Sequence, residues 1–232
     1  MRKIHVTGLA AALVLMVPLM ASAQDASRAV ADGGISVQGW QGKIDASEAA
    51  KGMTLSNAKL IKHGDALHAT TGPSVAYWHA SNTATGNYTV KATFREPKYM
   101  ALNNHPHPYG VFIGGNEMGS DNQTYLYCMA YGNGNFIVRG FGPAPFAVNG
   151  ARQQPGASVN KASGPGAEVT QEIALSVRGD KVECSINGQV VGSYNKADVV
   201  GAGKLKSTDG TYGIRFGHNT EAFVTGLTVT KN

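Results

Sequence analysis

Hydrophobic and polar residues alternate most regularly in residues 86–96. Tyr, Val, Ala and Phe occupy the even positions from 88 to 94, whereas Thr, Lys and Arg occupy the odd positions from 89 to 95. Successive side chains of a β-strand point to opposite faces, so this period of two indicates a strand with one face on a core and one in water. Pro97 ends the pattern, because proline has no N–H group to donate to a neighbouring strand.

Shorter patterns of the same kind follow one another along the chain, separated by turn residues. They predict strands at residues 37–44, 58–62, 66–70, 75–80, 109–114, 124–131, 135–139, 169–178, 211–218 and 221–230. A further pair of apolar runs flanks Asn187-Gly188, a dipeptide that strongly favours a hairpin turn. The long segment 142–166, rich in Gly, Pro and Ala, is expected to be a loop of the functional or mobile kind.

Helical patterns are short. Residues 45–52 and 196–200 each predict a single helical turn, the first with Asp45 as its N-cap. We find no amphipathic helix of normal length and no repeat of fixed period, which disfavours propellers and solenoids. The pattern therefore predicts an all-β fold, in which residues 35–232 form one domain, a two-sheet antiparallel β-sandwich.

The first residues have the composition of a secretory signal. Arg2 and Lys3 precede an apolar run at residues 9–20, and the small residues 21–23 precede Gln24. The apolar run falls short of the ~20 residues that span a bilayer, so we expect no membrane span once the signal is removed. Residues 1–23 are therefore predicted to direct export to a bacterial periplasm or exterior, followed by a flexible leader at 24–34.

Composition adds constraints on the partner. Glycine is abundant at 30 residues and only 15% of residues are charged, which suits short strands joined by tight turns. Without Arg2 and Lys3, the net charge falls from +5 to +3 (5 − 2), and the remaining basic residues are scattered. Nucleic acid is therefore not an expected partner. The sequence leaves the oligomeric state open.

Two cysteines, Cys128 and Cys184, remain in the predicted exported product. In an oxidising compartment they could form a disulfide, and closing a loop of 56 positions (184 − 128) would stabilise the fold by roughly 4 kcal/mol. The alternative is that each thiol packs separately as a small hydrophobic group. Neither cysteine has a second ligand at metal-binding spacing, so no metal is assigned to them.

Several segments resemble a known family. Residues 177–191 (VRGDKVECSINGQVV) and 212–217 (YGIRFG) resemble the late strands of concanavalin A-like jelly rolls of the laminin-G and glucanase type. Residues 109–116 (YGVFIGGN), followed by 121–127 (DNQTYLY), are similar to exported bacterial proteins grouped near the 3-keto-disaccharide hydrolase domain. The resemblance implies a concanavalin A-like jelly roll, a fold that carries lectins, lyases, hydrolases and inert modules alike.

The sequence departs from the glucanases of this fold. Those enzymes carry a Glu-x-Asp-x-x-Glu strand that places the nucleophile and the acid on one face about 5 Å apart. None of the seven glutamates of this chain stands in such a register with aspartate. Ordinary glucanase chemistry is therefore not expected.

Two histidines are candidates for catalysis. His105 and His107 alternate with prolines, and on an extended segment their imidazoles project the same way. They could act as acid and base or hold a metal, but the sequence shows no third ligand, and incidental surface histidines are the alternative. Arg139 and Arg215 alternate with apolar residues and are expected to project from the open face of a sheet. There they would orient a carboxylate or sugar hydroxyls, or be merely solvated.

The loop at residues 115–123 supplies polar candidates for ligand binding. Asn116, Glu117, Asp121 and Gln123 offer oxygen atoms and hydrogen-bonding groups. Calcium is kept open as a cofactor, although the spacing is not that of an EF-hand. A polar loop that merely keeps the surface soluble is the alternative.

Tyrosines supply the aromatic candidates, namely Tyr109, Tyr125 and Tyr127. Tyr125 and Tyr127 share one strand face, and Cys128 belongs to the other. If the tyrosines face outward they form a platform for sugar rings, and if they face inward they are core. A Cys128–Cys184 bridge would place Cys128 inward and the tyrosines outward.

These observations favour an exported β-sandwich that binds a carbohydrate or cell-envelope glycan on the concave face of a sheet. The first alternative is a hydrolase or lyase acting on a modified glycoside, with a histidine as base and an arginine for developing negative charge. The second is a structural or adhesion module of the cell envelope. A closed pocket with a shifted histidine pKa would favour the enzyme, and a shallow groove with exposed aromatic residues would favour binding.

Overall fold

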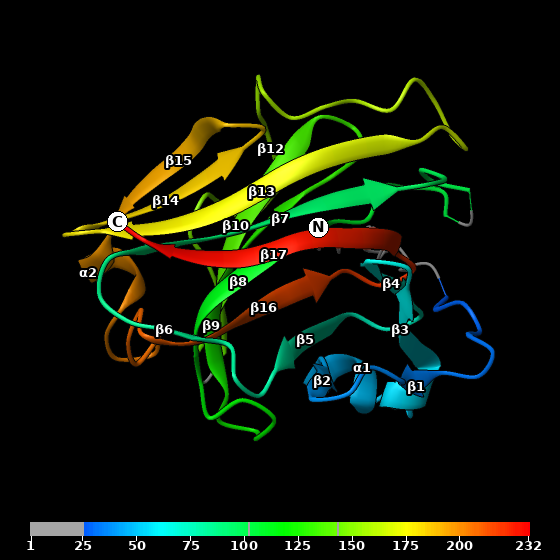
Figure 1. Cartoon of the computed structure of the whole chain (residues 1–232), viewed down its shortest axis with the longest axis horizontal. Coiled ribbons are helices and arrows are strands. Elements are labelled where there is room, and N and C mark those ends of the chain that lie inside the picture. Colours follow the sequence, from blue (N-terminus) through cyan, green and yellow to red (C-terminus); the bar gives the residue numbers. More distant parts are fainter. Residues whose placement is uncertain (1–25, 102, 143) are drawn as a thin grey trace, which may run out of the picture.

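Two β-sheets packed face to face form the protein in the computed structural model, which describes residues 26–101, 103–142 and 144–232 (Figure 1). The predicted signal at 1–23 lies outside the described residues. Sheet A has the strand order β1-β3-β4-β17-β7-β13-β14-β15. Its strands are β1 (Gly34–Ile35), β3 (Ala58–His63), β4 (Ala66–Thr71), β17 (Glu221–Lys231), β7 (Tyr88–Glu96), β13 (Val169–Arg178), β14 (Lys181–Ile186) and β15 (Gln189–Asn195).

Sheet B has the strand order β11-β10-β9-β8-β16-β5-β2, with β12 paired to β10 and β6 paired to β16. Its strands are β11 (Pro145–Ala147), β10 (Asn135–Phe141), β9 (Thr124–Ala130), β8 (Tyr109–Asn116), β16 (Gly210–Phe216), β5 (Val75–His79), β2 (Trp40–Ile44), β12 (Gln154–Pro155) and β6 (Thr83–Ala84). All pairs between these strands are antiparallel except β1 with β3. The predicted antiparallel two-sheet β-sandwich is thus confirmed.

Helices are minor elements. They are α1 (Ala46–Ala49), the 3₁₀ turn η1 (Leu55–Asn57) and α2 (Lys196–Val199). Among the described residues, no helix is both long enough and apolar enough to cross a membrane. Asp45 does stand at the N-cap of α1, as predicted, but its side chain does not cap the helix and is used elsewhere.

The core lies between the two sheets and is built from the alternating positions of facing strands. In β7 the even positions 88 to 94 are buried, whereas Lys91 is exposed, so the pattern of this strand is confirmed. Sheet A contributes large buried side chains such as Phe94 and Leu175, and sheet B contributes others such as Tyr77 and Phe216. The Asn187-Gly188 turn joins β14 to β15 with positive φ at both residues, as a tight hairpin requires.

Cys128 of β9 and Cys184 of β14 form a disulfide through this core, which joins sheet B to sheet A. Of the two alternatives that the sequence left open, the bridge is the one found. Because neighbouring residues of a strand point to opposite faces, Cys128 inward places Tyr127 and Met129 outward. The disulfide therefore fixes the orientation of the central strand of the candidate site.

The segments outside the predicted strands are tied to the sandwich. In the predicted leader, the backbone N–H of Arg28 donates to the side-chain oxygen of Asn219 (2.7 Å), and its Nε donates to the Thr71 carbonyl (2.9 Å). The predicted loop at 142–166 contains the short strands β11 and β12, both paired with β10. These pairings fasten the segment over one end of sheet B.

Candidate functional site

The outer face of sheet B carries an apolar cluster of its own, separate from the core between the sheets. Its buried members are Ala76, Trp78, Phe112, Tyr125, Tyr127, Met129 and Ile137. An outer face this apolar is unusual in a sandwich, where the solvent side of a strand is normally polar. Loops cover part of it, and the uncovered part is hollowed into a groove.

The groove has a volume of about 310 Å³.

Strands β9 and β10 form the floor of the groove through Tyr127, Met129 and Ile137. Its rim carries polar side chains, including Arg139 of β10 and Gln153 of the segment before β12. An apolar floor with polar groups at the rim is the usual composition of a small-molecule site.

The tyrosines of β9 lie on this outer face, as the disulfide requires, but they differ in access. Tyr125 is fully buried, with its ring stacked on Phe141 at 5.0 Å between centroids. Tyr127 is 5% exposed and lines the groove. Tyr125 therefore packs within the apolar cluster without lining the groove, and Tyr127 presents only a small part of its surface to the groove.

Arg215 of β16 lies among these aromatic rings. Its guanidinium carbon is 5.3 Å from the centroid of Tyr127 and 5.2 Å from that of Phe141. Its Nη1 donates to Oδ1 of Asp45 at 2.7 Å, and its Nη2 donates to Oδ2 at 2.5 Å. The side chain is only 4% exposed, so the expectation of a solvated arginine on an open face is wrong. A buried guanidinium needs a counter-charge, and Asp45 supplies it.

Three histidines meet at one end of the groove. The ring centroids of His105 and His107 are 4.3 Å apart, and that of His218 lies 3.9 Å from His107. His107 is 4% exposed, and its Nε2 is buried without a hydrogen-bond partner. Burial lowers the pKa of His107 to about 3, helped by the nearby His218, His105 and Arg28. This imidazole is therefore neutral at ordinary pH.

The register of sheet B explains why His107 and His218 meet. Tyr109 of β8 pairs with Phe216 of β16 in antiparallel fashion. Two residues before Tyr109 is His107, and two residues after Phe216 is His218, so the same register sets them opposite each other. His218 lines the groove but was not predicted from the sequence, because nothing local to it indicates this pairing; Tyr131 and Gln153 were not predicted either.

The predicted polar loop lies at the other end of β8 and β9. Glu117 forms an ion pair with Lys206, and Asp121 forms one with Lys43 at 2.8 Å. The Gln123 side-chain oxygen accepts from the Gly119 N–H at 3.2 Å, and the Asn116 amide donates to the Asp209 carbonyl at 3.0 Å. These four side chains do not line the groove.

Tyr109, the remaining predicted contact, lies on the core side of β8. It is fully buried, with its ring stacked on Phe94 at 5.6 Å between centroids. The structure therefore places the side chain of Tyr109 outside the groove. Of the predicted site residues, the groove brings together His105, His107, Tyr127, Arg139 and Arg215.

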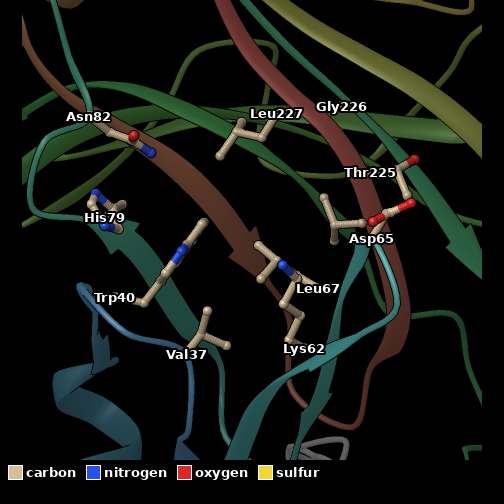
Figure 2. Close-up of a pocket in the computed structure, with 11 residues that line it drawn as sticks. Val37, Trp40, Lys62, Asp65, Leu67, His79, Asn82, Thr225, Gly226 and Leu227 are labelled. Atoms are coloured by element: carbon tan, nitrogen blue, oxygen red, sulfur yellow. The ribbon is translucent and has the colours of Figure 1, made fainter.

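A second hollow, of about 390 Å³, lies between strands of the two sheets (Figure 2). Trp40 projects into it, and Leu67 and Leu227 form further apolar parts of its wall. His79 and Asn82 lie at one end, and Asp65 and Thr225 at the other (Figure 2). The groove on sheet B holds the larger set of ionisable and hydrogen-bonding side chains, so we take it as the candidate site.

The two antiparallel sheets define a concanavalin A-like jelly roll, and comparison with solved structures agrees. Carbohydrate-binding module CBM66 from Bacillus subtilis matches with a TM-score of 0.56 at 7% identity, covering 86% of this chain and 99% of that chain. A Bacillus subtilis protein of unknown function with a galectin-like fold matches with a TM-score of 0.54 at 12% identity, covering 83% and 89%.

The exoplasmic/lumenal domain of VIP36, in its Ca²⁺/Man-bound form, matches with a TM-score of 0.52 at 7% identity, covering 84% of this chain and 83% of that chain. At these identities the likeness shows the fold alone. No protein-family model matches the sequence, and no curated protein matches it.

Proposed function

We propose that this protein binds a carbohydrate in the groove on the outer face of sheet B. The observation that carries the proposal is the combination of an aromatic and apolar floor with a polar rim in one cavity. Sugar rings present C–H faces that pack on aromatic side chains, and hydroxyls that need donors and acceptors. The groove offers both kinds of surface side by side.

Tyr131, Arg139 and Gln153 are the proposed contacts. Each is partly exposed and lines the groove. Arg139 carries five N–H donors in a planar fork, and one of its Nη groups donates to the Ala151 carbonyl at 2.6 Å. That bond holds the guanidinium at the rim, in a position to meet sugar hydroxyls or a carboxylate.

The loop at 116–123 would contact the ligand only if the ligand is long. It lies at the far end of β8, seven residues from Tyr109, which corresponds to about 20 Å of strand. A ligand that contacts both Arg139 and this loop would therefore be an extended oligosaccharide. A mono- or disaccharide would contact the groove alone.

Two of the similar folds support a glycan as ligand. One is by name a carbohydrate-binding module, and the other was solved with Ca²⁺ and Man bound. Export to a periplasm or exterior is part of the same proposal. It is supported by the Cys128–Cys184 disulfide, since disulfides persist in oxidising compartments.

A glycan array probed with the purified chain, with and without calcium, tests the proposal. We expect saturable binding that Arg139→Ala weakens at least tenfold, because a charge-assisted hydrogen bond contributes about 1.5–3 kcal/mol. Lys91→Ala, on the exposed face of sheet A, is the matched control and should bind like the wild type. Absence of wild-type binding to every glycan, or equal binding by the Arg139 variant, would refute the proposal.

The enzyme alternative rests on the histidines at the end of the groove. The resemblance to the 3-keto-disaccharide hydrolase group implies a hydrolase or lyase acting on a modified glycoside. Such an enzyme would need His105 or His107 as base. Arg215 is held by Asp45, so Arg139 is the arginine left to stabilise negative charge. If the wild type converts a sugar that it binds on the array, and His105→Ala abolishes this turnover, the enzyme alternative is supported over binding alone.

A further inference from the structure

We propose that His105, His107 and His218 together bind one divalent first-row transition-metal ion, with zinc as the reference ion. One ligand nitrogen from each ring can be chosen so that all lie within 4.8 Å of one another. Imidazole nitrogens are donors that zinc, copper and nickel favour, whereas calcium and magnesium take oxygen ligands. The site is therefore distinct in chemistry from the calcium site that the sequence left open.

The spacing suits a metal after a small closure. Zinc–nitrogen bonds of about 2.0–2.1 Å at tetrahedral angles put the nitrogens roughly 3.3 Å apart. The rings therefore need to approach by at most about 1.5 Å, which rotation of the side chains can supply. The paired ends of β8 and β16 hold the backbones of His107 and His218 opposite each other before any ion binds.

His107 supplies a second, independent observation. The residue is more than nine-tenths buried, its Nε2 has no hydrogen-bond partner, and its ring lies beside those of His105 and His218. A buried polar atom without a partner destabilises the folded state. Coordination of a metal would remove that destabilisation, because the ion accepts the lone pair of this nitrogen.

His105 has a neighbour that can orient it. Its Nδ1 lies 2.6 Å from the side-chain oxygen of Asn104. In the tautomer in which Nδ1–H donates this bond, Nε2 carries the lone pair that binds a metal. Metal-binding histidines commonly donate their second ring N–H in this way, which fixes both the tautomer and the ring orientation.

The surrounding charges are compatible with a cation. Arg28 is the cation that acts on His107, and its guanidinium lies 3.8 Å from the Glu221 carboxylate and donates to the Thr71 carbonyl. Three protein ligands leave one tetrahedral position for a water molecule or a ligand oxygen. The three rings line the same groove as Arg139, so the open position would serve the proposed carbohydrate site.

Isothermal titration calorimetry with Zn²⁺ tests the site in the chelator-treated full chain without a histidine tag. We expect one equivalent to bind, and His105→Ala and His218→Ala each to weaken binding at least tenfold. His79→Ala is the matched control, because His79 lies in β5 and bonds to Ser81 outside the groove. Co²⁺ in place of Zn²⁺ should give the visible absorption of a tetrahedral site in the wild type and not in the variants.

Several outcomes would overturn the proposal. They are no stoichiometric Zn²⁺ binding by the wild type, binding that His105→Ala leaves unchanged, and Ca²⁺ competing equally with Zn²⁺. His105 is partly exposed, so His105→Ala should fold even if a change at the buried His218 does not. The titration contains no sugar, so its result decides the metal proposal independently of whether the protein binds a carbohydrate.

Discussion

Asp45 and Arg215 form a two-point ion pair across 170 residues of sequence, with one carboxylate oxygen on each terminal nitrogen. The guanidinium is 4% exposed and the carboxylate 16% exposed. The pair joins the start of α1 to the centre of sheet B and closes one side of the groove. Burial disfavours the charged guanidinium, but the Asp45 carboxylate raises the pKa of Arg215 and keeps it charged.

Breaking this pair should destabilise the fold strongly. Asp45→Ala leaves a buried guanidinium without its counter-charge, which costs roughly 3–5 kcal/mol of unfolding free energy. Arg215→Met with Asp45→Ala should cost less than the sum of the single changes, and urea unfolding measures all three. Glu172→Ala, which breaks the exposed Lys91–Glu172 pair, is the control and should cost at most about 1 kcal/mol. Additive costs would contradict the coupling.

Glu96 should make stability depend on pH. Burial raises its pKa to about 7 from an ordinary 4.5, so between these values the folded state binds more protons than the unfolded state. Stability from this group is full below pH 4.5 and is lost as pH rises through 7, by about 3 kcal/mol in total. Glu96→Gln removes this loss. The unfolding free energy of the variant relative to that of the wild type should therefore rise as the pH increases from 4.5 through 7.

Urea unfolding of both proteins at several pH values between 4 and 8 measures this difference. His107, whose pKa is lowered to about 3, contributes a slope of the opposite sign up to its ordinary 6.5. That slope is present in both proteins and cancels when they are compared. A difference that stays constant with pH would contradict the assignment to Glu96.

Gly110 should not tolerate a side chain. A Cβ at this position of β8 would lie directly against the backbone carbonyl oxygen of Cys128 and 2.8 Å from the Cα of Met129. Backbone atoms of a central strand cannot yield as a flexible side chain can, so Gly110→Ala should cost about 3 kcal/mol or more. Gly164→Ala, where a Cβ meets open space, is the control. Thermal unfolding compares the two, and similar melting temperatures would contradict the prediction.

The disulfide should contribute strongly to stability. It closes a separation of 56 residues, and the chain-entropy model assigns such a loop roughly 4 kcal/mol. Replacing both Cys128 and Cys184 by alanine should lower the unfolding free energy by about that amount, as should reductant acting on the wild type. A loss below about 1 kcal/mol in urea unfolding would contradict this account.

Local pattern was sufficient for most of the fold. The alternation in β7 and the Asn187-Gly188 turn depend on neighbouring residues, and the structure confirms both. The order of strands depends on distant residues. For example, β17 lies between β4 and β7, and no local signal in the last residues of the chain indicates those partners.

The candidate site was harder to predict for the same reason. Arg215 was expected in solvent because its strand alternates, but the residue that buries and pairs it lies 170 positions earlier. His218 joins His105 and His107 only through the register of β8 with β16. The residue types indicated candidate site residues, but only the three-dimensional fold shows which of these side chains lie together.

The bond between Cys128 and Cys184 also makes the groove floor depend on the redox state of the chain. Cys128 stands next to Tyr127 and Met129 of the groove floor, and its partner belongs to the opposite sheet. A chain made in a reducing compartment would carry two thiols there and a floor strand not yet anchored to sheet A. The proposed ligand binding would then depend on oxidation of the two thiols, so a chain kept reduced should bind more weakly than the bridged chain.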